Sequence, residues 1–348
     1  MSLHTRRMSG QHVLLLGSAL VLLSLLNASA RGAYGISVAD IARTLWALAS
    51  GGLDGSPEQL VFLNIRLPRL FLGLAAGAGL GLSGALMQGL FRNPLADPGL
   101  IGVSSGAALA AGITIVLGSR FFPDLPRSLG SWTLVATAFA GSLSVTALIY
   151  MLAQSDGGTR VGLMLLAGVA INALAGAGLG GLSFLASDEQ LRSLQFWLLG
   201  SLGGARWSAV VLVCTIVLIA ACAGATCARP LNAIALGEAQ AVLLGVDVER
   251  TKRLAIGVTA LAVGAVTATT GMIGFVGLLA PHCVRLVAGP DHRVVLPGSA
   301  MLGAALVLLA DSVARTAVQP AELPLGVLTA LVGVPFFLVL LRQFKGRV

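Results

Sequence analysis

The sequence predicts an all-α, polytopic membrane protein, and three observations support this fold class. Of its 348 residues, 56% are hydrophobic and only 10% are charged, whereas soluble domains carry about 25% charged residues. The mean hydropathy is +0.92. Between Arg66 and Ala110, two apolar stretches rich in glycine and alanine flank the polar break FRNPLADP. A soluble domain with so few charged side chains could not cover its surface, so we expect one transmembrane domain over residues 1–348.

Ten segments are apolar enough and long enough to cross a bilayer, which takes about 20 helical residues. They are residues 11–30, 62–90, 100–118, 132–153, 161–185, 207–227, 254–272, 274–288, 296–317 and 325–341. In the second segment, Gly73, Gly77 and Gly81 recur every four residues and therefore share one helix face, where a neighbouring membrane helix can approach closely. Between spans, residues 38–49 and 188–199 are amphipathic and predict surface helices or packed loops.

The first apolar segment has two interpretations. Arg6 and Arg7 precede it, and Ala28-Ser29-Ala30 resembles a cleavage site, as in a secretory signal peptide. Residues 11–30 are also long enough for a span that is retained in the mature protein. We favour the retained span.

The charges between the spans predict the orientation of the chain. An even number of spans places both termini on one side of the membrane. With the termini in the cytoplasm, 13 lysines and arginines lie inside and nine outside, which is the bias expected for cytoplasmic loops. Anionic membrane lipid then accounts for the net charge of +8. The sequence contains no basic patch interleaved with aromatic residues, which is the pattern that would indicate a nucleic-acid partner.

The longest inner connection, residues 229–253, contains a predicted helix from Ala235 to Leu244. Gly245 suits the C-terminal end of this helix, and Asp247 suits the N-cap of the next helix. A structured cytoplasmic loop favours contact with a partner protein, although an ordinary solvated connection explains the same residues.

The chain carries no recognisable source of energy for transport. A Walker A motif needs a lysine followed by serine or threonine, but Lys252 and Lys345 are followed by arginine and glycine. Ion-driven carriers usually place acidic residues inside the membrane. Here only Asp311 lies within a span, and Arg315, four residues later, could pair with it locally. The four cysteines fit no zinc, haem-attachment or disulfide spacing.

Several motifs, in order along residues 60–342, resemble the FecCD family. They are RLPR at 66–69, SGALMQGLFRNPLADPGLIGVSSGA from Ser83, LGV at 244–246, GMIGFVGLLAPHCVRLVAGPDHRVVLPGSA from Gly271 and ELPLGVLTALVGVPFFLVLL from Glu322. The family comprises permease subunits of type II ABC importers for vitamin B12, ferric siderophores and haem. The resemblance implies their ten-span fold, a homodimer, two cytoplasmic ABC ATPase subunits, a periplasmic substrate-binding protein, no cofactor, and a place in the bacterial inner membrane.

The resemblance also implies roles for particular residues. Arg66, Arg69 and Arg315 match outer arginines that hold carboxylates of the binding protein, a contact for which the forked guanidinium is well suited. Contact with lipid headgroups is the alternative. The segment that couples the permease to the ATPase matches Leu236, Gly237, Glu238, Ala239, Leu244, Gly245 and Val246.

The family counterpart of the fifth predicted span lines the translocation path. Its small and polar residues here are Gly168, Asn172, Gly176 and Gly180. They would give a wide lumen for a bulky chelate, although tight helix packing explains the same glycines. His282 and His292 lie in contexts considered as iron-ligand positions in haem permeases. We expect a structural role for both near the ATPase, and no metal site.

The predicted function is the permease subunit of an ATP-driven importer for an iron chelate, with haem first and a ferric siderophore close behind. Cobalamin is the alternative cargo. An ion-coupled secondary transporter is the alternative class, which the lack of buried acids disfavours. The chain itself is not expected to be an enzyme, since its partners would hydrolyse ATP.

Overall fold

The computed structural model describes residues 8–32, 34–118, 132–155 and 157–345. This part of the chain is mainly helical, and its strands are limited to an antiparallel hairpin of β1 (Gln154–Ser155) and β2 (Gly158–Thr159). The all-α fold class is therefore confirmed. Of the charges counted for the orientation, those at positions 6, 7, 120, 127 and 347 lie outside the described residues.

Seven of the described helices are long and apolar enough to cross a membrane. They are α1 (Gly10–Ala30), the continuous helix of α3 (Pro57–Val61), η1 (Phe62–Arg66) and α4 (Leu67–Leu90), then α8 (Trp132–Leu152), α9 (Val161–Leu185), α11 (Trp207–Thr226), α14 (Val248–Thr270) and α16 (His292–Ala314). Three shorter apolar helices are α5 (Val103–Ile113) with η3 (Thr114–Gly118), α15 (Val276–Ala288) and α17 (Leu325–Lys345). Each of these corresponds to one of the ten predicted spans.

The connections contain short helices, two of which the sequence predicted. These are α2 (Val38–Ser50) and α10 (Asp188–Leu199). Each begins with a capping box, at Ser37 and Ser187, in which two free backbone donors of the first turn are satisfied reciprocally. The remaining connections hold η2 (Pro98–Ile101), α12 (Ala228–Ile234) and α13 (Glu238–Leu243).

Two of the spanning helices that begin earlier than hydropathy predicts do so at an aspartate. The helix α14 starts at Val248 rather than 254, and α16 starts at His292 rather than 296. In each case an aspartate, Asp247 or Asp291, accepts a hydrogen bond from a backbone N–H of the first turn. This N-cap stabilises a turn whose charged residues lower its hydropathy. The predicted cap at Asp247 is confirmed.

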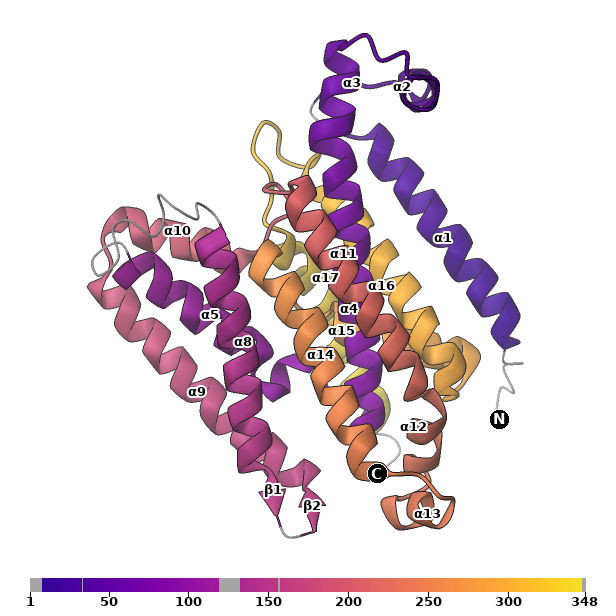
Figure 1. Ribbon diagram of the computed structural model, residues 1–348, viewed down its shortest axis with the longest axis vertical. Helices are drawn as coiled ribbons and strands as arrows, with labels where there is room; N and C mark the ends of the chain where they lie inside the picture. The colour runs from indigo at the N-terminus through magenta and orange to yellow at the C-terminus, as the bar shows by residue number, and fades with distance from the viewer. Residues whose placement is uncertain (1–7, 33, 119–131, 156, 346–348) are drawn as a thin grey trace.

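The spanning helices run alternately up and down, so their connections gather at two ends of the molecule (Figure 1). At the upper end lie α2, α3 and α10; we call it the α10 end. At the lower end lie the start of α1, the end of α17, the β1–β2 hairpin, α12 and α13; we call it the α13 end (Figure 1). The start of the first helix and the end of the last helix therefore lie on the same side, as an even number of spans requires.

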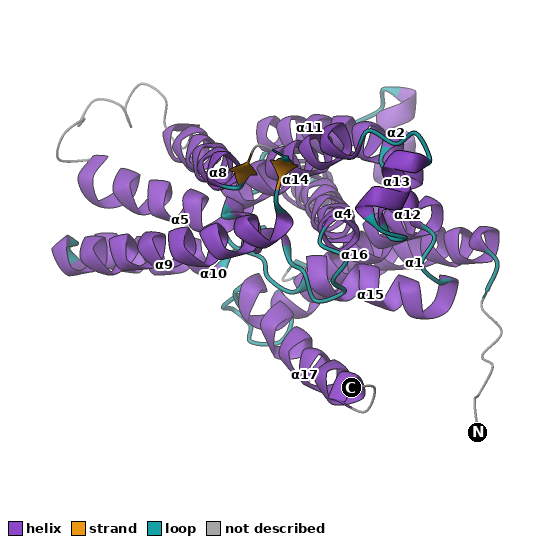
Figure 2. Ribbon diagram, turned by 90° about the horizontal axis from the view of Figure 1, so that it is seen from below, coloured by secondary structure: helices purple, strands orange, loops and turns teal. Residues whose placement is uncertain are grey.

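The helices form two groups that pack side by side. One group contains α5, α8, α9 and α10, and α14 of the main bundle packs against its α8 and α5 (Figures 1 and 2). Seen from the α13 end, α9 and α17 lie at the periphery (Figure 2). Their outward faces carry exposed apolar side chains such as Val169 and Leu331, which are 63% and 65% exposed. These faces are suited to lipid or to another chain.

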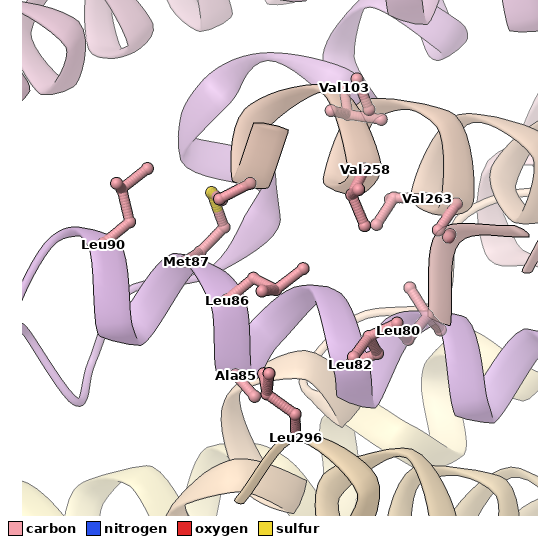
Figure 3. Packing of buried hydrophobic residues seen from close by; sticks show 14 of the residues in the cluster. Leu80, Leu82, Ala85, Leu86, Met87, Leu90, Val103, Val258, Val263 and Leu296 are labelled. Atoms are coloured by element: carbon pink, nitrogen blue, oxygen red, sulfur yellow. The ribbon is translucent and has the colours of Figure 1, made fainter. Parts of the chain in front are cut away.

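The helix α4 is the centre of the main bundle. In the continuous helix that includes it, 83% of the most apolar window is buried, against 17% for α9. Figure 3 shows Leu82 and Leu86 of α4 among Val258 and Val263 of α14 and Leu296 of α16. Burial of such side chains contributes about 1.5–3 kcal/mol each in water, but in lipid the close packing itself provides the specificity.

The predicted glycine face of α4 forms its contact with α16. A Cβ on Gly77 would overlap the carbonyl oxygen of Gly303, and a Cβ on Gly81 would overlap that of Ser299. The two backbones are therefore too close for any larger residue. This confirms the expectation that small residues permit a close helix approach.

Candidate functional site

The three arginines predicted for docking, Arg66, Arg69 and Arg315, come together at the α10 end, where η1, α4 and α16 meet. Their exposed fractions are only 4%, 8% and 7%. A buried guanidinium needs hydrogen-bond partners, because its removal from water is unfavourable. Each of the three finds such partners within this chain.

Arg69 is held between two carboxylates. Its Nε and Nη2 donate to Asp311 Oδ1 at 3.0 and 2.8 Å, and its Nη1 and Nη2 donate to Glu322 Oε1 and Oε2, both at 2.9 Å. These bonds use four of the five guanidinium N–H groups. The Asp311 side chain is 3% exposed, whereas that of Glu322 is 44% exposed. Glu322 is therefore the partner that another protein can reach.

Arg66 and Arg315 hold the end of α1. Arg315 Nη2 donates to the carbonyl oxygen of Ala28 at 3.1 Å, while Arg66 donates to the carbonyl oxygens of Ser29 at 2.7 Å and of Tyr34. The last carbonyl groups of a helix lack partners within the helix, and cations stabilise its C-terminal end. The two arginines therefore fix α1 against α4 and α16.

The sequence indicated only part of this network. Asp311 and Arg315 lie four residues apart on α16, and their ion pair is 3.0 Å long, as their spacing suggested. Glu322 escaped the sequence analysis because it meets Arg69 across 253 positions; its place at the start of the motif ELPLG was the available signal. The hydrogen bond from Arg69 lowers the pKa of Glu322 below its usual value.

At the α13 end, the predicted helix 235–244 is wrong in its first part. The helix α12 ends at Ile234, and α13 begins only at Glu238. Between them, Gly237 has a φ of 126°, a conformation that residues with a Cβ rarely adopt, so the helix is interrupted there. Gly245, with a φ of 80°, follows the end of α13 as predicted.

The helix α13 and its flanks present an apolar surface at this end of the molecule. Its large side chains are more than half exposed, and they are Leu236 (69%), Val242 (61%), Leu243 (87%) and Leu244 (64%). Among the predicted coupling residues, Leu236, Ala239, Leu244 and Gly245 are exposed, whereas Gly237, Glu238 and Val246 are half-buried. Contiguous exposed apolar residues of this kind mark interaction surfaces.

A buried lysine ties this surface to the neighbouring helical group. Lys252 of α14 is 4% exposed and donates to Glu238 Oε2 at 2.7 Å and to the carbonyl oxygen of Thr159 at 2.8 Å. One turn earlier, Glu249 Oε2 accepts from the backbone N–H of Thr159 at 2.9 Å. Because Thr159 closes the hairpin just before α9 begins, these bonds link α13, α14 and α9.

The four residues predicted to line the path on α9 divide into two pairs. Gly168 is buried, and a Cβ there would overlap a carbonyl oxygen of η2. Asn172 donates to another carbonyl oxygen of η2 at 3.1 Å. Gly176 and Gly180 are exposed, and a Cβ at either would meet nothing within 4 Å. The first pair therefore fixes η2 against α9, while the second lies on an open face.

The two histidines have different neighbours. His282 of α15 is 8% exposed, and its ring packs edge-on against Phe336 of α17, with 5.9 Å between ring centroids. His292, the first residue of α16, is 4% exposed, and its Nδ1 lies 2.7 Å from Asn232 Oδ1. Within the described chain, neither belongs to a group of three or more His, Cys, Asp or Glu residues that could hold a metal ion.

Known proteins resemble this chain over most of its length. The hemin transport system permease protein of Yersinia pestis is 44% identical over 337 residues, which is 96% of this chain and 97% of that protein. The cobalamin import system permease protein of Halobacterium salinarum is 45% identical over 298 residues, or 84% and 77% of the two chains. A solved inward-facing conformation of an ABC transporter assigned to the metal-chelate type superimposes with a TM-score of 0.81 at 29% identity, covering 96% of this chain and 100% of that one.

The FecCD transport family matches residues 18–343. This range runs from α1 to α17 and includes the arginines of the α10 end, the apolar surface around α13 and the open face of α9. The family resemblance inferred from the sequence motifs is thereby confirmed. The chain belongs to the FecCD transport family.

Proposed function

We propose that this chain is the transmembrane permease subunit of an ATP-driven ABC importer, which moves an iron chelate from the periplasm to the cytoplasm. Family membership over residues 18–343 carries the proposal, together with relatives named as hemin and cobalamin permeases. Haem is the first choice of cargo because the hemin permease aligns over 96% of this chain. A ferric siderophore is chemically close, and cobalamin is the second candidate on the strength of the relative from Halobacterium salinarum.

In this function the α13 end faces the cytoplasm and the α10 end faces the periplasm of a bacterial inner membrane. Both chain termini are then cytoplasmic. Among the described residues, ten lysines and arginines belong to the α13 end and seven to the α10 end, and this excess supports the orientation. Retention of α1 is supported by Arg66 and Arg315, whose buried guanidinium groups would lose acceptors if residues 1–30 were removed.

At the α10 end, the periplasmic binding protein docks by an exchange of carboxylates on Arg69. While Glu322 is bound, Arg69 has no free pair of N–H donors. A carboxylate of the binding protein takes the place of Glu322, which returns to solvent, while the buried Asp311 stays as the counter-ion. Arg66 and Arg315 add positive charge at the same place, and they contact a further carboxylate by releasing carbonyl groups of α1.

At the α13 end, two ATPase subunits dock on the apolar surface around α13 and hydrolyse the ATP that this chain cannot bind through a P-loop. The exposed Leu243 and Leu244 support a protein contact there. Movement of α13 would be transmitted by Lys252 to Thr159 and from there to α9. This link connects the proposed docking surface with the proposed path.

Two copies of the chain form a homodimer with the translocation path between them. The open face of α9, with Gly176, Gly180 and the 90% exposed Phe184, supports this arrangement, because the two glycines permit a close approach and an exposed large apolar side chain is suited to an interface. Facing copies would enclose a path with small apolar walls, which suits a bulky chelate delivered by a binding protein. Membrane lipid covers the remaining apolar surface.

Reconstituted transport tests the proposal. Proteoliposomes containing the permease, its cognate ATPase subunit and its binding protein should accumulate hemin when ATP is present, and the permease alone should hydrolyse no ATP. Ferric siderophores and cobalamin are assayed in parallel. Uptake of cobalamin without hemin would change the cargo, whereas ATP-independent uptake driven by an ion gradient would refute the importer class.

A further inference from the structure

A cavity of about 260 Å³ lies at the α13 end, separate from the apolar surface around α13. Its walls come from the last turn of α4 and the bend that follows, the last turns of α15, the first residue of α16, and Ala235 after α12. Segments far apart in the sequence therefore meet around this space. The feature that distinguishes it is its charge.

The walls of this cavity carry two positive charges and no carboxylate. Arg285 donates to Gln88 Oε1 and, at 3.5 Å, to the carbonyl oxygen of Ala85. Within the described residues neither Arg285 nor Arg92 takes part in an ion pair. Charges removed from water are normally paired. The guanidinium of Arg285 is half-buried and therefore partly removed from water, but it has no carboxylate in the described chain to balance its charge.

His292, in the same wall, is a second and independent observation that points to a ligand. Its backbone N–H and its Nδ1 both face Asn232 Oδ1, at 2.9 and 2.7 Å. Since the backbone N–H can only donate, the Asn232 atom is an acceptor, so Nδ1 carries a proton and Nε2 of the neutral ring is an acceptor. Nε2 is buried and has no partner among the described residues. It points toward Gly89 of the cavity wall, where a Cβ would lie 2.5 Å away.

We propose that the cavity receives a segment of the ATPase subunit that presents a carboxylate to Arg285 and Arg92 and a hydrogen-bond donor to His292 Nε2. The inference rests on the proposed function, which brings the ATPase to this end. Paired guanidinium groups suit a carboxylate. A polypeptide can meet both needs with one residue, because every acidic side chain of a protein has a backbone N–H beside it; binding of a lipid headgroup is an outcome that the test distinguishes.

The test measures the affinity of the purified cognate ATPase subunit for the permease in nanodiscs of zwitterionic lipid. Arg285→Gln should weaken binding by about 30-fold or more, as when one partner of a buried charge pair is truncated. Arg92→Asn should weaken it by about two- to fivefold, as for an exposed pair. Asparagine tolerates the φ of 49° at this position, so this variant keeps the test valid if Arg285→Gln fails to fold.

Arg293→Gln is the matched control, because it removes the same charge beside His292 but lies outside the cavity wall. It should leave the affinity within about twofold of the wild-type value. A photo-crosslinker at Asn93, in the wall, should capture a peptide of the ATPase subunit that contains Asp or Glu. Neutralising that acid should abolish the further effect of Arg285→Gln in a double-mutant cycle.

Equal losses from Arg285→Gln and Arg293→Gln, or additive effects in the cycle, would overturn the proposal. So would crosslinking to lipid in place of the subunit, or saturable binding of inorganic phosphate that depends on Arg285 while the affinity of the subunit does not. If the wild-type permease binds no ATPase subunit at all, the proposed function fails and this inference fails with it. If the wild-type permease binds the ATPase subunit and only the cavity variants lose binding, both the proposed function and this inference are supported.

Discussion

Replacing Glu322 with glutamine tests whether this side chain competes with a docking protein for Arg69. The substitution keeps the shape of the side chain but removes the charge that receives two N–H bonds of 2.9 Å. Because the Glu322 side chain is 44% exposed, solvent screens the pair, which contributes only about 0.2–1 kcal/mol. Removing this competition should therefore tighten the binding of the periplasmic protein by up to about fivefold.

The matched substitution Asp311→Asn should behave differently. The Asp311 side chain is 3% exposed and pairs with both Arg69 and Arg315. Its neutralisation leaves Arg315 without its ion pair and Arg69 with only the part-exposed Glu322, and breaking a buried pair destabilises a protein by about 3–5 kcal/mol. We expect a lower unfolding temperature and loss of folded permease, with no gain in docking affinity.

The assay is a titration of the binding protein against the permease–ATPase complex in nanodiscs, at low and physiological salt, with thermal unfolding measured in parallel. Arg69→Gln serves as the reference for lost docking. If Arg69→Gln abolishes binding while Glu322→Gln leaves the affinity unchanged, the partner reaches Arg69 without displacing Glu322, and the exchange is refuted. If Arg69→Gln is also silent, this arginine is not part of the docking site.

Three further predictions address other parts of the molecule. Lys252→Met should preserve assembly but reduce chelate uptake per ATP hydrolysed severalfold in proteoliposomes, with partial rescue by Lys252→Arg; an unchanged ratio would contradict the link from α13 to α9. Gly81→Val should prevent the contact between α4 and α16 and abolish the monodisperse peak in size-exclusion chromatography, and a normal peak would contradict that packing. Because Arg69 lowers the pKa of Glu322, their pair stabilises fully above the unfolded pKa of about 4.3 and less as pH falls through the folded value. The difference in unfolding temperature between wild type and Glu322→Gln should therefore be constant near neutral pH, decrease as the pH falls below about 4.3, and disappear only below the lowered pKa of Glu322 in the folded protein.

The helices could be predicted because their signals are local in the sequence. The segment 188–199 is amphipathic, and Ser187 with Gln190 forms a capping box three residues apart, so α10 has the predicted bounds. The glycines of α4 likewise recur about once per helix turn, at Gly73, Gly77 and Gly81. Local signals failed where a backbone conformation decided the outcome. At Gly237 a positive φ of 126° interrupts a stretch whose composition favours a helix.

The candidate sites could be predicted only in part, because their geometry depends on contacts between distant segments. Arg69 was expected near the outer surface, yet its partners Asp311 and Glu322 lie 242 and 253 positions away, and together they bury it. Nothing near Arg69 in the sequence indicates those partners. In the sequence Lys252 is notable only for the arginine that follows it, whereas its bond to Thr159 crosses 93 positions. Such pairs become visible only when the helices are placed side by side.

The arginines at the two ends of the molecule would bind a partner's carboxylate in different ways, and this difference suits the two kinds of partner. In the proposed docking at Arg69, an incoming carboxylate would replace Glu322, which is already bound, so one pair would be exchanged for another and the net gain would be small. At Arg285 a carboxylate would be added to a cation without an ion pair in the described chain, so the full interaction is gained. A binding protein that must leave after each delivery matches the first arrangement. An ATPase subunit that stays through many cycles matches the second, which is why we expect the inner contact to survive salt concentrations that release the outer one.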